Sequence, residues 1–371
     1  MKTFYILENS NSPHEEGIIT LIEVLKYKGC KVVLCLNQLS EQRMRKFANI
    51  NLVDEIVRID SIKELVLLPA KINNAGILLH NTVSVRNSFT TVFLGCLVRN
   101  NVYYIRNANS WLFFSNHEGA FYYRVLRYIS TALKKFLLKR AQYLIVESDQ
   151  IKNYLSKYTS MRIEIIPYKY YTTVTNKNSS TQNVISFVVP GAVDLERKPL
   201  DVVIAALRNL PNQYLKKIKI ILLGRPLGET ARKLCDEWMK EFGDSLEYFN
   251  GFVENEVFEK TVNDATYILC SFKLKHQDRY LDEVYGETKG SGVFGQAISY
   301  GKPLIVNKGF KVPSEIESST LYFEDASELC NIFKEAVANE ANRSILISNA
   351  YKNSSSFTIE NIANSLNLST R

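Results

Sequence analysis

The sequence predicts an α/β protein of two domains, each built on a parallel sheet. Short apolar runs alternate with segments of helical periodicity along the 371 residues, which is the pattern of strand–helix–strand units. The length suits two domains of ordinary size. One polar stretch rich in Ser, Thr and Asn, residues 168–182, lacks a core pattern and is expected to be the interdomain linker.

Composition indicates a soluble globular protein, with 46% hydrophobic and 23% charged residues. No apolar run reaches the roughly 18 residues of a membrane-spanning helix, and the N-terminus turns polar at Glu8, too early for a signal peptide. The six cysteines are scattered without metal-binding spacing, so we expect no metal site and reduced thiols in the cytoplasm. A net charge of +8 allows nucleic acid, an anionic membrane or a phosphorylated substrate as partner.

In the first half, polar residues follow the predicted strands. Strands are expected at 4–7, 31–36, 55–59, 76–79, 101–105, 143–147 and 162–166, and helices at 17–27, 43–48, 88–97 and 150–158. Ligands of open α/β sheets gather beyond the carboxyl ends of strands. The candidates there are His14, His80, Arg106 and Asn109. Each of these residues is either a ligand contact or a structural residue, and the sequence leaves both readings open.

Residues 119–140 are expected to form a basic amphipathic helix. The charged residues in this range are all basic, and its apolar residues recur at helical intervals. The basic residues are Arg124, Arg127, Lys134, Lys135, Lys139 and Arg140. One interpretation is a surface helix that packs one face inward. The other is a helix at an anionic membrane surface.

The second half contains the stretch on which the functional reading depends, Tyr285 to Asn307. Gly290, Ser291 and Gly292 form a small turn, residues 293–300 read as a helix, and Gly301 followed by Pro303 ends it. Free N–H groups at a helix start are a ready site for a phosphate. The other expected strands are 184–189, 218–223, 246–249, 267–270 and 304–306, and the other helices are 201–210, 230–242, 254–263 and one ending at 338.

The motif GVFGQAISYGKPLI resembles a segment of GT-B glycosyltransferases, E-x-F-G-x-x-x-L-E-A-x-A-x-G-K-P-V-I. Three further segments resemble the same family and occur in its order over residues 183–330: FVVPGAVDLERKPLDVVIAALRNL, IILLGRPLGETARKL and FNGFVENEVFEKTVNDATYILCSF. The first half matches only in its strand and helix pattern. The resemblance is nearest to the retaining, nucleotide-sugar-dependent group of the family.

This resemblance implies two Rossmann-like domains with parallel sheets that face each other across a cleft. Residues 1–167 would bind the acceptor, 183–350 the nucleotide sugar, and 351–371 would form a helical segment that returns to the first domain. The implied activity is transfer of a hexose from a nucleotide sugar to a glycan or lipid-linked acceptor, in bacterial surface polysaccharide synthesis. The expected protein is cytoplasmic or peripheral at the inner face of the membrane, and nucleic acid is not expected as a partner because no recognition motif occurs.

The resemblance also assigns residues to roles. The donor would contact Arg197, Lys198, Gly224, Phe252, Val253, Gly290, Ser291, Gly292, Val293 and Gln296, with Glu287 as the catalytic carboxylate. The acceptor would contact His14, His80, Arg106 and Asn109. No D-x-D motif occurs, so neither a metal nor another cofactor is indicated, as is usual in GT-B enzymes.

The chain departs from the family pattern at several positions. Gln296 stands where the second Glu of the acidic pair is expected, Thr288 lies eight residues before it, and Glu287 is one position off. The Gly-rich turn after the first strand is replaced by SNSPHEEG. Two alternatives therefore remain beside the glycosyltransferase: a nucleotide-sugar epimerase, and a non-catalytic sugar- or nucleotide-binding GT-B protein.

Overall fold

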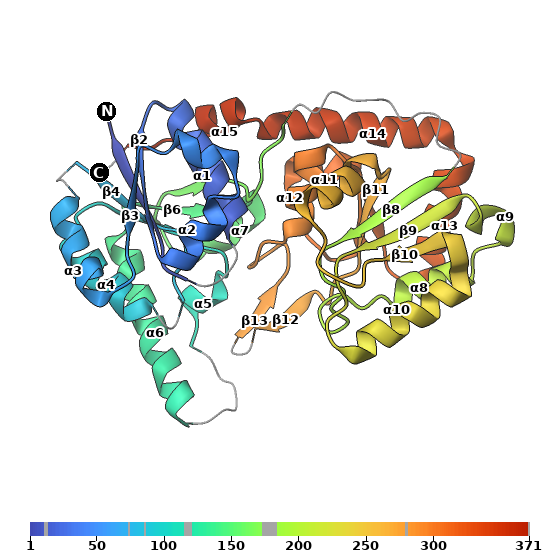
Figure 1. Cartoon of the computed structure of the whole chain (residues 1–371), viewed down its shortest axis with the longest axis horizontal. Helices are drawn as coiled ribbons and strands as arrows, with labels where there is room; N and C mark the ends of the chain where they lie inside the picture. The colour runs from blue at the N-terminus through green and yellow to red at the C-terminus, as the bar shows by residue number, and fades with distance from the viewer. Residues whose placement is uncertain are drawn as a thin grey trace. The chain divides into compact units, whose positions relative to one another are not determined.

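The computed structural model describes residues 1–10, 14–72, 75–84, 87–114, 121–172, 184–278 and 281–369. The chain forms two compact units, each with its own parallel sheet (Figure 1). Unit 1 comprises Met1–Tyr170, Gln277–Gly290 and Thr358–Arg371, and unit 2 comprises Tyr171–His276 and Ser291–Phe357. The parallel α/β class predicted from the alternating pattern is confirmed.

The sheet of unit 1 has seven strands in the order β3-β2-β1-β4-β5-β6-β7. Their bounds are β1 (Thr3–Glu8), β2 (Lys31–Leu36), β3 (Glu55–Arg58), β4 (Ile77–His80), β5 (Asn101–Tyr104), β6 (Tyr143–Val146) and β7 (Ile163–Ile165). The helices are α1 (Glu15–Tyr27), α2 (Gln38–Met44), α3 (Ile62–Lys71), α4 (Ser88–Leu97), α5 (Asn109–Leu112), α6 (Phe121–Arg140), α7 (Asp149–Leu155) and α15 (Ile359–Ser365). A 3₁₀ helix covers Ala48–Leu52.

The sheet of unit 2 has six strands in the order β10-β9-β8-β11-β14-β15. Their bounds are β8 (Ile185–Pro190), β9 (Ile218–Leu223), β10 (Leu246–Tyr248), β11 (Tyr267–Cys270), β14 (Leu304–Asn307) and β15 (Thr320–Phe323). The helices are α8 (Asp201–Arg208), α9 (Asn212–Leu215), α10 (Glu229–Phe242), α11 (Asn255–Asp264), α12 (Gly292–Tyr300), α13 (Ala326–Ala338) and α14 (Glu340–Ser354). Short 3₁₀ helices cover Gly243–Ser245, Ser314–Ser319 and Ser355–Phe357.

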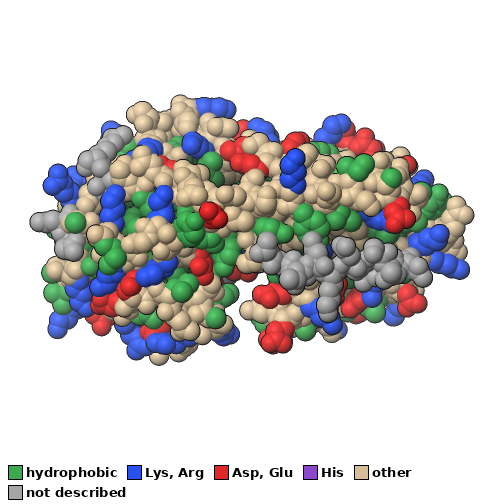
Figure 2. All heavy atoms as spheres, turned by 90° about the horizontal axis from the view of Figure 1, so that it is seen from above, with side chains coloured by type: hydrophobic (Ala, Val, Ile, Leu, Met, Phe, Trp, Pro, Cys, Tyr) green, Lys and Arg blue, Asp and Glu red, His purple; other side chains and the backbone are tan. Residues whose placement is uncertain are grey.

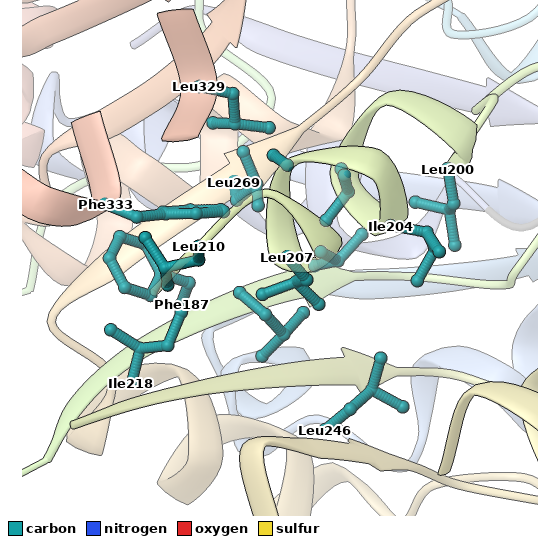
Figure 3. Packing of buried hydrophobic residues seen from close by; sticks show 14 of the residues in the cluster. Phe187, Leu200, Ile204, Leu207, Leu210, Ile218, Leu246, Leu269, Leu329 and Phe333 are labelled. Carbon is teal, nitrogen blue, oxygen red and sulfur yellow. The ribbon is translucent and has the colours of Figure 1, made fainter. Parts of the chain in front are cut away.

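Aromatic stacking organises the core of unit 2 (Figure 3). The ring of Phe187, on the central strand β8, stacks on Tyr267 at 5.1 Å and meets Phe333 of α13 edge-on at 4.8 Å. Ile204 and Leu207 of α8 are buried in the same cluster. Each such side chain contributes about 1.5–3 kcal/mol when fully buried, so this cluster fixes how α8 and α13 cover the strands.

The described division of the chain differs from the expected domain boundaries in two places. Residues 277–290, expected in the second domain, belong to unit 1, and the return to unit 1 begins at Thr358. The expected linker, residues 168–182, crosses the boundary between Tyr170 and Tyr171, and its residues 173–182 lie outside the described part of the chain.

The C-terminal segment is held on unit 1 by lysine side chains. Lys28 Nζ donates to the carbonyl oxygens of Ala363 and Leu366 at 2.7 and 3.1 Å, at the end of α15. Lys2 Nζ donates to the carbonyl oxygen of Leu368 at 2.8 Å. These ammonium groups tie the end of α15 and the residues after it to the chain just after α1 and just before β1.

Several expected elements differ from the structure for identifiable reasons. The helix expected at 43–48 is α2, which begins earlier because Asn37 caps it by accepting from the N–H of Ser40. The long polar loop expected at 273–289 contains two paired strands, β12 (Lys275–Asp278) and β13 (Leu281–Val284). Helix α3 was not expected, since Pro69 lies inside it; the capping box of Ser61 and Glu64 starts it nonetheless.

Gly224 provides a test of the backbone packing in unit 2. A Cβ atom there would lie 2.5 Å from the carbonyl carbon of Gly191, so the two loops after β8 and β9 would have to separate. We expect Gly224→Ala to destabilise the protein by about 1–3 kcal/mol, the usual cost of overpacking. Gly251→Ala is the control, because nothing lies within 4 Å of its Cβ position. Urea unfolding midpoints measure both, and equal midpoints would contradict the prediction.

Candidate functional site

The order of strands in unit 2 reverses between β8 and β11, and this reversal marks where a ligand is expected. From β8 toward one edge of the sheet, the neighbours are the later strands β9 and β10, and on its other side they are β11, β14 and β15. Successive strands are therefore added on opposite sides of β8, although all six strands are parallel. In open parallel sheets, ligands bind beyond the carboxyl ends of the two strands at such a point. The loop that leaves β8 contains Lys198, and the chain that leaves β11 reaches Ser291 after the strands β12 and β13.

The ammonium group of Lys198 lies at the ends of both strands. Its Nζ donates to the carbonyl oxygen of Pro190, the last residue of β8, at 2.7 Å. Burial raises the pKa of Cys270, the last residue of β11, to about 11, and the positive charge of Lys198 acts against this rise. The loops are also joined directly, because the N–H of Lys273 donates to the carbonyl oxygen of Arg197 at 2.9 Å.

The second feature at this edge is the start of α12. Ser291 is its N-cap and accepts a hydrogen bond from the N–H of Val293 at 3.4 Å. The helix ends at Gly301 in the left-handed conformation, as the sequence predicted. The first N–H groups of a helix carry a partial positive charge. An ammonium group and a helix start at one edge of a sheet form a setting that suits a diphosphate.

Asn307 was not predicted from the sequence, although it ends β14 at the same edge. Its Oδ1 accepts from the N–H of Phe272 at 2.8 Å, and its Nδ2 donates to the carbonyl oxygen of the same residue at 3.1 Å. Phe272 also stacks on Phe310 at 4.7 Å. These contacts fix the course of the chain as it leaves β11.

The other predicted donor residues have different settings. Arg197 is paired with Asp194, with Nε to Oδ2 at 2.5 Å, so its guanidinium is committed to the turn. Phe252 is 77% exposed, Val253 is half-buried, and Val293 and Gln296 are buried on α12. Gly224 packs its Cα against the backbone of Gly191. Glu287 and Gly290 belong to unit 1, whereas Ser291 and Gly292 belong to unit 2.

The carboxyl edge of the sheet in unit 1 holds a chain of buried polar contacts. Glu8, at the end of β1, accepts from Asn81 Nδ2 at 2.5 Å and from Thr82 Oγ1 at 2.7 Å. Asn81 Oδ1 in turn accepts from Arg106 Nη2 at 3.0 Å. Strands β1 and β4 are the pair at which strand order reverses in this sheet, so the chain of contacts begins where a ligand site of unit 1 is expected.

Arg106 is the centre of these contacts. Its Nη1 pairs with Glu147 Oε1 at 3.0 Å, and its guanidinium lies over the ring of Tyr104 at 4.3 Å and that of Tyr168 at 5.5 Å. Burial raises the pKa of Glu147, and the charge of Arg106 opposes this rise. Such pairing is what makes buried charges tolerable. Each partner sits at a strand end, but the sequence does not show which strands are neighbours, so Glu8, Asn81 and Glu147 were missed.

The two histidines predicted to contact the acceptor differ in position. His14 is partly exposed next to Arg106, and burial together with that charge lowers its pKa to about 3, so it is neutral near pH 7. The ring of His80 is 1% exposed, hydrogen-bonds Asn101 through Nε2 at 3.0 Å and stacks on Tyr103 at 4.8 Å. His80 is therefore a core residue and not the acceptor contact that the sequence predicted, because its ring is enclosed by the strands beside it.

A buried carboxylate joins residues 281–290 to α5. Glu283 is 1% exposed, and its oxygens accept from the N–H of Ser110 at 3.2 Å and from Thr288 Oγ1 at 2.5 Å. The N–H of Ala108 donates to the carbonyl oxygen of Thr288 at 2.7 Å. Asn109, predicted to contact the acceptor, donates from Nδ2 to the carbonyl oxygen of Asp282 at 2.6 Å. Asn109 therefore fixes β13 in place.

Gly290, at the end of residues 281–290, has no space for a side chain. A Cβ atom there would lie 1.7 Å from Glu147 Oε2, so only glycine fits against that carboxylate.

In the part of the chain that the structure describes, no group of three or more His, Cys, Asp or Glu side chains is placed to hold a metal ion. Likewise, none of the described helices is both long and apolar enough to cross a membrane.

Comparison with solved structures establishes the fold. No protein-family model matches the sequence, and no curated protein matches it either. The structure of Anabaena HepE in complex with UDP superposes with a TM-score of 0.68 at 13% identity, covering 98% of this chain and 97% of that one. A glycosyltransferase from Rickettsia africae gives 0.63 at 11% identity, covering 98% and 96%.

A third structure agrees with these two. The Escherichia coli trehalose-6-phosphate protein bound to UDP-2-fluoro glucose gives a TM-score of 0.59 at 11% identity, covering 98% of this chain and 97% of that one. These three GT-B structures each align with nearly the whole of this chain. The chain has the GT-B fold, as the motif in its second half predicted.

Glu283 predicts a pH dependence of stability. Burial raises its pKa from the ordinary 4.5 to about 7, so between these values the folded protein binds one more proton than the unfolded chain. The contribution of Glu283 to the free energy of unfolding is therefore complete below pH 4.5. It falls by about 1.4 kcal/mol per pH unit above that value and is lost as the pH rises through 7. Glu283→Gln should flatten this part of the profile.

Urea unfolding at several pH values between about 5 and 8 measures the slope of the unfolding free energy. Asp282→Asn is the matched control, because that neighbouring carboxylate is exposed. A profile that keeps its wild-type slope in Glu283→Gln, or that flattens equally in the control, would contradict the assignment to Glu283.

Proposed function

We propose that the protein is a glycosyltransferase that moves a hexose from a nucleotide sugar to a glycan or lipid-linked acceptor, without a metal ion, in bacterial surface polysaccharide synthesis. The observation that carries the proposal is that the Lys198 ammonium lies at the reversal point of unit 2 and that α12 starts at the same edge of the sheet. The fold supports it, since the HepE structures of the same fold were solved with UDP and with UDP-glucose.

The reaction needs positive charge at the departing phosphate. The bond between the anomeric carbon and the diphosphate oxygen breaks, and the acceptor oxygen bonds the anomeric carbon and loses its proton. Negative charge then grows on the diphosphate, and fixed cations and N–H donors aimed at it lower the barrier. In this proposal Lys198 and the N–H groups after Ser291 supply that stabilisation, which makes a divalent metal unnecessary.

The remaining donor contacts are carried over from the resemblance to the GT-B family. The backbone of Phe252 and Val253 is assigned to the base, and Gln296 to the ribose hydroxyls. Glu287 is assigned to the donor sugar, with Gly290 leaving space beside Glu147. On unit 1, His14 and Arg106 remain the predicted acceptor contacts, with Glu147 beside them.

Removing either phosphate contact should weaken donor binding. Lys198→Ala removes one charge-assisted contact, and Gly292→Val places a branched side chain at the first residue of α12. Each should weaken binding of a nucleoside diphosphate by about tenfold to a hundredfold, or roughly 1.5–3 kcal/mol. Titration calorimetry with UDP and the other nucleoside diphosphates measures the loss.

Lys216→Ala is the control, because this lysine of unit 2 is exposed and lies after α9, away from the reversal point. Wild-type affinity in both site variants for every nucleoside diphosphate would refute the site. Tight diphosphate binding without sugar transfer to any acceptor would favour the alternative of a non-catalytic GT-B protein.

We also propose that unit 1 binds an anionic membrane through the exposed faces of α4 and α6, which pack against each other. On α4, Phe89, Phe93 and Leu97 are 51%, 40% and 55% exposed at a spacing of four residues, which places them in one stripe. Among the side chains of α6 that the structure describes, the exposed apolar ones are Phe121, Tyr122, Val125, Tyr128 and Phe136. We call these eight side chains the apolar face.

The charges around the apolar face are positive. Arg99, Arg124, Lys139 and Arg140 are exposed, and Lys135 is half-buried, while α6 contains no acidic residue. Two cations expected to face a membrane, Arg127 and Lys134, are buried instead, and Lys134 donates to Ser110 Oγ at 3.2 Å. By contrast, Figure 2 shows a face on which basic and acidic side chains are interspersed. Apolar side chains ringed by cations suit the headgroup region of anionic lipid.

Charge removal tests this membrane proposal. Replacing Arg124, Lys135, Lys139 and Arg140 with Gln should lower co-sedimentation with phosphatidylglycerol vesicles more than tenfold, since each cation contributes on the order of 1 kcal/mol. The control replaces the exposed Lys216, Lys217, Lys233 and Lys240 of unit 2 and changes the net charge equally. Equal sedimentation of both variants and wild type would exclude α6 as the anchor.

A further inference from the structure

Three aromatic side chains gather on unit 1 beside the start of α5. Phe113 follows α5, Tyr154 lies near the end of α7, and Tyr158 follows α7. The ring centroids of Phe113 and Tyr158 are 5.3 Å apart, and those of Tyr154 and Tyr158 are 5.4 Å apart. We call these three residues the aromatic platform. Phe113 is 37% and Tyr158 is 50% exposed, and an exposed cluster of this kind marks an interaction site more often than a single exposed ring does.

The platform is held in place by hydrogen bonds to residues already placed at the site. Tyr154 Oη donates to Asn109 Oδ1 at 2.6 Å, and Asn109 Nδ2 donates to the carbonyl oxygen of Asp282 at 2.6 Å. Asn109 thus joins the ring of Tyr154 to β13. The ring of Tyr154 is thus anchored to two elements and keeps one orientation, so a ligand would not have to order it.

Carboxylates lie next to the platform. Burial raises the pKa of Tyr154, and the neighbouring Tyr158 together with the charges of Glu283 and Glu287 raises it further. Asp282, on the same strand as Glu283, is exposed. The surface therefore presents apolar ring faces with the exposed carboxylate of Asp282 near them, whereas Glu283 is buried. The ammonium group of Lys157 lies 5.9 Å from the centroid of the Tyr154 ring.

This combination selects among ligand classes. A sugar ring has an apolar face of C–H groups and a rim of hydroxyl donors, so it can stack on an aromatic side chain while its hydroxyls donate to carboxylates. A bare alkyl chain would leave the polar rim without partners.

We propose that Phe113, Tyr154 and Tyr158 form a carbohydrate-binding subsite in which a sugar ring of the acceptor stacks, with its hydroxyls directed toward the exposed carboxylate of Asp282. The inference rests on the proposed function in one respect, that the bound sugar is the acceptor. It commits to a glycan as the part of the acceptor that unit 1 recognises. Sugar binding itself does not depend on the donor and can be measured without it.

The first experiment measures binding alone. The full-length protein is applied to an array of neutral and acidic oligosaccharides in the absence of nucleotide, and the best binder is titrated by NMR. We expect Tyr158→Ala to lose affinity for it roughly tenfold, and Tyr158→Phe, which keeps the ring, to retain it. Tyr27→Ala is the matched control, because Tyr27 is 51% exposed on α1 of the same unit.

The outcomes separate the subsite from the proposed function. No oligosaccharide bound by the wild type, or wild-type affinity in Tyr158→Ala, overturns the subsite, and so does an equal loss in Tyr27→Ala. Decyl phosphate is titrated in the same way as a probe with an alkyl chain. If Tyr158→Ala loses binding to decyl phosphate but keeps oligosaccharide binding, the subsite is also overturned, because the platform would then bind a lipid tail. Loss of oligosaccharide binding in Tyr158→Ala supports it, even where calorimetry finds no nucleotide binding and the glycosyltransferase proposal fails.

Discussion

The placement of one buried carboxylate determines much of the site on unit 1. Glu283 accepts hydrogen bonds from the N–H groups at the start of α5 and from Thr288, and so fixes residues 281–290. Once this segment is fixed, Asn109 reaches Asp282 and Tyr154, and Gly290 meets Glu147. A carboxylate buried to this extent is costly when ionised, which is why its pKa rises to about 7. The segment that carries Glu287 is therefore held by an interaction whose strength depends on protonation.

The sequence predicted the elements of this fold better than the contacts between them. Strands 31–36, 218–223 and 267–270 and the helix 88–97 match the structure residue for residue, because each is a strongly patterned run with clear ends. Helix α14 was missed because its apolar residues form no stripe. Strand β15 and the pair β12 and β13 were missed because they are short and, in part, polar.

The candidate site divides in the same way. Lys198 and Ser291 could be placed at this edge from the sequence, because Lys198 follows a patterned strand by one loop and Ser291 stands at the start of a recognisable helix motif. Glu8, Asn81 and Glu147 also end strands, but their meeting at Arg106 depends on β1 lying beside β4, which the order of elements in the sequence does not state. For His80 the error is the reverse: its position at the end of a strand led us to predict a ligand contact, but its ring is buried.

The two sheets present opposite chemistry at equivalent edges. At the reversal point of unit 2 there are an ammonium group and a helix start, which attract a phosphate. At the reversal point of unit 1 stands Glu8, with Glu147 nearby, and the guanidinium of Arg106 is already paired. His14 adds no charge near pH 7, because its pKa is lowered to about 3. A phosphate would meet carboxylates there, whereas hydroxyl groups would meet hydrogen-bond acceptors, so the chemistry of this edge suits the acceptor role that we propose for unit 1 better than it suits a diphosphate.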